Sequence, residues 1–185
     1  MTNNFFEQEY IKACNEESDI NEHIPVLRSL AKEVSHITEM GVRTGVSTRS
    51  FLCENATLRL YDIKLDGEVS SLVNTAKSMG KDVEYYEKNV LEVEIEETDF
   101  LFIDTWHCYE QLVRELELHA PKVKKYIGFH DTQTYGTKSE VFMGKIGSNG
   151  LLPAIIEYLI SHPEWRFKIH RTNNNGLSVI ERVLK

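Results

Sequence analysis

The residues of this chain best suited to chemistry stand at the ends of four apolar runs. Acids, glycines and a histidine follow these runs, and the runs have the composition of buried β-strands. In an open parallel sheet, ligands bind beyond the carboxyl ends of the strands, near the point where the strand order reverses. We therefore predict one ligand site formed by four segments, namely residues 39–45, Asp62, Asp104 and residues 130–131.

The first segment reads Glu39-x-Gly41-x-x-x-Gly45-x-Ser47 and leads into an amphipathic stretch. Glycines let a ligand lie against the backbone, and Ser47 or Thr48 is a natural N-cap of a helix that presents unpaired N–H groups. The spacing is neither that of dinucleotide enzymes nor that of a phosphate loop. An acid before the first glycine favours a ligand with positive charge, such as S-adenosylmethionine. An ordinary strand–turn–helix is the alternative interpretation.

This motif resembles the first motif of the class I methyltransferases that use S-adenosylmethionine. The resemblance implies that Glu39, Gly41, Gly45 and Ser47 hold this cofactor. Asp62 lies where an acid accepts hydrogen bonds from ribose hydroxyls, and Asp66 is a weaker candidate for that role. The same resemblance implies that Asn89 and Val90 lie near the adenine.

Asp104 and the pair His130-Asp131 end two strands that are neighbours in such a fold. Neighbouring strands lie about 4.8 Å apart, so these side chains can converge on one point. Two carboxylates and an imidazole suit a hard cation, Mg²⁺ or Mn²⁺, which would orient an acceptor hydroxyl and lower its pKa. Without a metal, His130 or His107 could take the proton. Alternatively, Asp104 only caps a helix and His130 is a core histidine.

The resemblance extends to a subgroup of class I methyltransferases. Asp104-x-x-His107-x-Tyr109, followed by a strand that ends in His130-Asp131, is similar to proteins named for cephalosporin hydroxylase and to relatives of antibiotic-sugar O-methyltransferases. The similarity covers about residues 19–183. Metal-dependent members usually carry two acids after the fifth strand, whereas this chain has His130 before Asp131. The resemblance therefore leaves the need for a metal open.

Strand patterns alternate with helix patterns along the chain, which predicts a doubly wound α/β fold with a mostly parallel sheet of about seven strands. An Asn-Gly turn at 175–176 between two alternating segments predicts an antiparallel C-terminal hairpin. Residues 1–18 are predicted to form an N-terminal arm and residues 19–185 one methyltransferase domain. A helix is expected to start at Ser18 or Asp19, with Pro25 in its first turn.

The composition narrows the range of partners and locations. The chain has 185 residues and a net charge of -8, which disfavours binding to a nucleic-acid backbone. Three cysteines form no metal or disulfide pattern, and no signal peptide or membrane span is evident, so a cytoplasmic protein is expected.

These observations predict an S-adenosylmethionine-dependent methyltransferase that transfers a methyl group to a hydroxyl of a small molecule or sugar. The polar loop 133–150 is expected to shape the acceptor pocket through Tyr135 and Phe142. A non-catalytic nucleoside-binding or scaffold protein with the same fold is the alternative, and a nicotinamide-dependent dehydrogenase is a weaker third. The short chain leaves open a homo-oligomer in which a partner subunit completes the pocket.

Overall fold

The computed structural model of this protein describes residues 3–183 and centres on one seven-stranded sheet. The strand order is β3-β2-β1-β4-β5-β9-β8. The first five strands in this order are parallel, and β9 runs antiparallel to both of its neighbours. The strands are β1 His36–Met40, β2 Thr57–Asp62, β3 Val83–Glu87, β4 Thr98–Ile103, β5 Val123–His130, β8 Trp165–Arg171 and β9 Leu177–Arg182. This topology confirms the predicted sheet with its antiparallel C-terminal hairpin.

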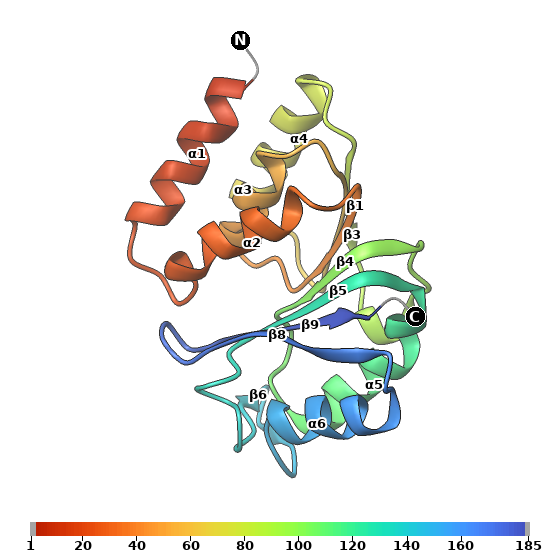
Figure 1. Cartoon of the computed structure of the whole chain (residues 1–185). Coiled ribbons are helices and arrows are strands. Elements are labelled where there is room, and N and C mark those ends of the chain that lie inside the picture. Colours follow the sequence, from red (N-terminus) through yellow and green to blue (C-terminus); the bar gives the residue numbers. More distant parts are fainter. Residues whose placement is uncertain (1–2, 184–185) are drawn as a thin grey trace.

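Helices cover both faces of the sheet (Figure 1). Side chains of the first four helices share one core cluster with the sheet, and side chains of the last two share the other. Along β4, Phe100 and Phe102 belong to the first cluster, whereas Leu101 and Ile103 belong to the second. The helices are α1 Asn3–Asn15, α2 Ile24–Ala31, α3 Val46–Leu52, α4 Gly67–Ser78, α5 Tyr109–His119 and α6 Leu151–Ser161. An unbroken apolar run is therefore required in β4, because both of its faces are covered.

The N-terminal helix α1 packs on α2 and α3 (Figure 1). Phe6 is buried in the core, Glu7 pairs with Arg28 at 2.7 Å, and Glu9 pairs with Arg49 at 3.1 Å. The boundary of the arm at residue 18 stays a prediction. None of the helices within residues 3–183 has the length and apolar character needed to cross a membrane.

The start of the second helix differs from the prediction. A 3₁₀ turn, Asn21–His23, precedes α2, and His23 rather than Ser18 or Asp19 occupies its N-cap. The β8–β9 loop explains the difference, because Asn174 donates to the Ser18 carbonyl and accepts from the Glu22 amide. Pro25 lies in the first turn of α2, as predicted.

The loop at 133–150 contains a short hairpin that the sequence did not indicate. Its strands are β6, Val141–Phe142, and β7, Lys145–Ile146, and they pair antiparallel outside the main sheet. Hydrogen bonds from Leu151 and Leu152 to the carbonyls of Tyr135 and Gly136 close the base of the loop.

Candidate active site

The turn after β1 is held against the end of β4. Gly41 has a φ of +82°, and a Cβ at this position would overlap the backbone carbonyl of Asp104. The Asp104 amide donates to the Met40 carbonyl at 2.8 Å, which fixes the two strand ends side by side. Gly41 is therefore needed for close backbone approach, and it also lines the cleft described below.

The N-cap of α3 differs from the prediction. Gly45, with a φ of +72°, takes the N-cap position, and the helix begins at Val46. Ser47 and Thr48 instead donate their hydroxyl hydrogens to the carboxyl group of Glu39, the Thr48 bond being 2.7 Å long. A buried acid requires such donors, and this requirement outweighs the local preference of serine for a cap.

Glu39 lies in β1, two residues before Gly41, and is completely buried. Burial raises its pKa to about 8, although the hydrogen bonds from Ser47 and Thr48 oppose this shift. Since its two oxygens are occupied by hydroxyl groups of α3, Glu39 connects β1 to the first turn of that helix.

Asp62, at the end of β2, also holds the glycine turn. Its Oδ2 accepts hydrogen bonds from the amides of Val42 and Arg43, at 2.8 and 2.9 Å. Asp66, the weaker candidate for the same ribose role, accepts from the Glu68 amide and is the N-cap of α4. Of these two acids, only Asp62 lines the cleft.

A cleft of about 1080 Å³ opens along the carboxyl ends of the parallel strands. Its walls come from the segments that follow β1, β2, β3, β4 and β5, together with the β6–β7 hairpin. Arg43 and Asp19 form an ion pair on the cleft wall, joining the glycine turn to the segment after α1. Such a position is the usual ligand site of a doubly wound sheet.

The cleft collects most of the residues that the sequence predicted for the site. Those in its lining are Gly41, Asp62, Asn89, Val90, Asp104, His107, Asp131, Tyr135 and Phe142. Among the described residues, Glu39, Gly45, Ser47 and His130 lie outside the lining. Asn89 also accepts a hydrogen bond from the Leu91 amide and so caps the 3₁₀ turn Val90–Glu92.

Two acids and two histidines converge where β4 and β5 end. His107 Nε2 lies 3.0 Å from Asp104 Oδ1 and 3.3 Å from Asp131 Oδ2. His130 Nδ1 lies 3.3 and 3.4 Å from the same two oxygens. Asp131 has a φ of +58°, an uncommon conformation outside glycine that turns the chain directly after β5. The convergence predicted for these strand ends is thus present.

The charges in this cluster support one another. Burial alone would raise the pKa of Asp104, but His130 and His107 hold that pKa well below its usual range. Burial alone would lower the pKa of His130, but Asp104 and Asp131 raise it instead. Burial alone would also lower the pKa of His107, but Asp104, Asp131 and Glu140 raise it instead. Asp104 is therefore ionised at neutral pH.

The donor set fits a divalent cation. Asp104, His107 and Asp131 each offer a ligand atom, and these atoms lie within 4.8 Å of one another. Asp131 Oδ1 is buried and has no hydrogen-bond partner among residues 3–183. Carboxylate oxygens with one imidazole suit Mg²⁺ or Mn²⁺. The predicted metal set was Asp104, His130 and Asp131, and the group of ligand atoms that meet here includes His107.

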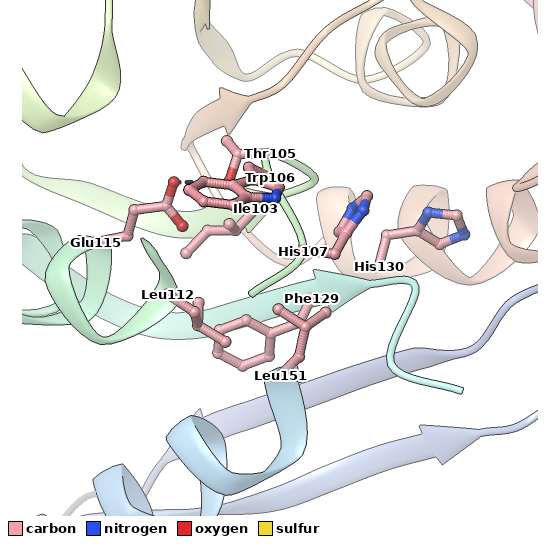
Figure 2. A pocket seen from close by; sticks show the side chains of 9 residues that line it. All are labelled: Ile103, Thr105, Trp106, His107, Leu112, Glu115, Phe129, His130 and Leu151. Carbon is pink, nitrogen blue, oxygen red and sulfur yellow. Dashed lines mark hydrogen bonds between the residues drawn. The ribbon is translucent and has the colours of Figure 1, made fainter. Parts of the chain in front are cut away.

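A small cavity of about 10 Å³ shares Thr105, Trp106 and His107 with the lining of the cleft (Figure 2). Figure 2 shows Glu115 on one side of it and the two histidines on the other. Thr105 and Gln111 donate to Glu115 Oε1 at 2.6 and 2.7 Å, and burial raises the pKa of Glu115 to about 7. Glu115 thus orients two side chains that line the cleft.

Sequence reasoning missed Glu115, Glu140 and Trp106. Glu115 carries a recognisable signal, because it stands in the buried stripe of α5 between Leu112 and Leu116. No sequence signal marks Glu140 or Trp106, because both lie in segments without the hydrophobic periodicity of a helix or a strand.

No family model and no curated protein matches this chain. Several solved structures share its fold. A candidate caffeoyl-CoA O-methyltransferase from Staphylococcus aureus is 17% identical, with a TM-score of 0.63 over 87% of this chain and 83% of that chain. A 1,6-didemethyltoxoflavin N1-methyltransferase from Burkholderia thailandensis, with bound S-adenosylhomocysteine, is 12% identical, with a TM-score of 0.68 over 98% and 87%.

A third structure is the N-methyltransferase NodS from Bradyrhizobium japonicum in complex with S-adenosylhomocysteine. It is 13% identical, with a TM-score of 0.65 over 98% of both chains. At these identities the likeness concerns the fold. With its seven-stranded sheet and its reversed strand β9, the chain has the fold of the class I S-adenosylmethionine-dependent methyltransferases.

Proposed function

We propose that this protein is an S-adenosylmethionine-dependent methyltransferase that methylates a hydroxyl group of a small molecule or sugar. The observation that carries the proposal is the cluster of Asp104, His107 and Asp131, which opens into the cleft close to the glycine turn. Two solved proteins with this fold hold S-adenosylhomocysteine, the product of such a transfer.

The glycine turn and the ends of β2 and β3 would hold the cofactor. Gly41 offers backbone without a side chain, Asp62 accepts from ribose hydroxyls, and Asn89 lies near the adenine. Glu39, Gly45 and Ser47 act from outside the cleft lining, since they fix the turn and the start of α3.

Methyl transfer needs an acceptor oxygen that has lost, or is losing, its proton. That oxygen forms a bond to the methyl carbon while the carbon–sulfur bond breaks, and the sulfonium leaves as a neutral thioether. Without a cation, His107 would take the proton, because it lines the cleft and the two carboxylates beside Nε2 stabilise its charged form. His130 is fully buried behind them, so it would act by holding Asp104 in place.

A Mg²⁺ or Mn²⁺ ion held by Asp104, His107 and Asp131 would supply a Lewis acid that lowers the pKa of the acceptor hydroxyl. In this assignment His130 supports the two carboxylates rather than binding the ion. Tyr135 stacks on the His107 ring with their centroids 5.1 Å apart, which fixes the plane of that ring.

A thermal-unfolding series tests this proposal. The protein is heated with S-adenosylmethionine, S-adenosylhomocysteine or NAD⁺, each with and without Mg²⁺. A ligand at a hundred times its dissociation constant stabilises by about 2.7 kcal/mol, so both adenosyl compounds should raise the unfolding temperature by several degrees. NAD⁺ should not. A shift with NAD⁺ alone, or no shift with either adenosyl compound, would contradict the proposal.

A further inference from the structure

The β6–β7 hairpin lines part of the cleft, although its apolar side chains are largely exposed. We define the acceptor hairpin as residues 139–147. Val141, Met143 and Ile146 are among the most exposed apolar side chains of the described part of the chain, at 66%, 82% and 69%. Phe142 and Met143 nevertheless line the cleft. Something other than a hydrophobic core must therefore hold this hairpin in place.

Glu140 supplies most of that attachment. Its Oε2 lies 3.0 Å from His107 Nδ1 and accepts a hydrogen bond from the His107 amide at 3.3 Å. Its own amide donates to the His107 carbonyl at 2.9 Å, and its carbonyl accepts from Trp106 Nε1 at 3.2 Å. Phe142, two residues later, packs against Trp106 with ring centroids 6.1 Å apart. The hairpin is thus docked onto the segment that carries His107.

The same contact sets the direction of the His107 ring. Because a carboxylate lies beside Nδ1 and holds the proton there, a cation that binds this histidine displaces the proton of Nε2 and takes its lone pair. Nε2 faces Asp104 and Asp131, the other two members of the proposed cation set. Glu140 therefore touches the cation site on one side and anchors the hairpin on the other.

We propose that Glu140 couples cation binding at Asp104, His107 and Asp131 to docking of the acceptor hairpin. The inference rests on the cation site of the proposed function. A bound cation fixes His107, and a fixed His107 holds Glu140 and the hairpin over the cleft. By reciprocity, a docked hairpin strengthens cation binding by the same factor. Glu140 is thus a positioning residue, and the wall of the acceptor pocket is completed when the cation is present.

Hydrogen exchange of the wild-type protein, with Mn²⁺ alone as the probe, tests the coupling without any substitution. Mn²⁺ should slow amide exchange severalfold within residues 139–147 and leave the β8–β9 loop unchanged. If Mn²⁺ binds but exchange of the hairpin stays the same, the coupling is wrong.

The reciprocal test uses Glu140→Ala and the paramagnetic resonance signal of free Mn²⁺. Loss of a carboxylate behind a ligating histidine typically costs 10- to 100-fold in metal affinity, and we expect about that loss here. Glu140→Gln, which keeps a neutral acceptor, should fall between the wild type and Glu140→Ala. Glu157→Gln is the matched control, because Glu157 accepts a hydrogen bond from Tyr109 and lies in a separate groove between α5 and α6.

The outcomes separate this inference from the proposed function. Equal Mn²⁺ affinity in wild type and a folded Glu140→Ala would overturn the coupling and leave the cation site standing. No Mn²⁺ binding to the wild type would overturn both the coupling and the cation site. S-adenosylhomocysteine binding, measured on the same samples, reports on the methyltransferase assignment independently.

Discussion

Asp104→Asn should lower the rate of methyl transfer by about 10³-fold, as expected when several kcal/mol of stabilisation are lost. Asp104 contacts both histidines and belongs to the proposed cation set, so a neutral amide removes charge where the acceptor must be activated. Affinity for S-adenosylhomocysteine should stay largely intact, because the glycine turn and Asp62 are unchanged. The measurements are release of S-adenosylhomocysteine with an acceptor that the wild type methylates, and calorimetric titration of the same product.

Asp99→Asn is a matched control for this substitution. Asp99 lies at the opposite end of β4, where its Oδ2 accepts hydrogen bonds from Ser35 and the His36 amide. Both the rate and the product affinity should match the wild type. A large loss of product affinity in Asp104→Asn would contradict this division of roles. If the rate falls only as far as weaker cofactor binding explains, Asp104 belongs to the cofactor site.

The second large effect concerns stability as a function of pH. Glu39 is buried, and its pKa in the folded protein is about 8 against an ordinary value of 4.5. Between these two values the folded chain binds a proton that the unfolded chain has lost. The free energy of unfolding therefore falls as the pH rises from 4.5 to about 8, and it is insensitive to Glu39 above that.

Glu39→Gln should remove this slope, since glutamine imitates the protonated acid. The variant should gain stability relative to wild type as the pH rises, by a few kcal/mol at pH 8, because each pKa unit is worth about 1.4 kcal/mol. Denaturant unfolding across this pH range measures the difference. Glu84→Gln is the control, because Glu84 forms an exposed ion pair with Lys77. The stability of this variant should depend on pH in the same way as that of the wild type. A constant difference between Glu39→Gln and wild type at every pH would refute this account of Glu39.

The sheet and the position of the site were predictable because both depend on apolar runs and the residues that follow them. Phe100 to Ile103 contribute side chains to both core clusters, and such a run is typical of a parallel strand. Once the strands are parallel, their carboxyl ends share one edge. The meeting of Asp104 and Asp131 follows from that geometry.

What the sequence could not predict depends on contacts between distant segments. Serine is a residue type that often caps helices, yet the hydroxyl of Ser47 donates a hydrogen bond to Glu39, a buried acid of β1. The predicted helix does not start at Ser18, because Asn174 of the β8–β9 loop donates a hydrogen bond to the Ser18 carbonyl. The carboxylate of Glu140, thirty-three residues away, lies 3.0 Å from Nδ1 of His107, a contact that no local pattern indicates. Patterns within one element carry no information about such partners.

The most direct test is a crystal structure of the protein with S-adenosylhomocysteine. The nucleoside should lie across the ends of β1, β2 and β3, with the sulfur atom directed toward Asp104 and His107. A nucleoside bound elsewhere, for example in the groove between α5 and α6, or a sulfur atom directed away from these two residues, would contradict the assignment.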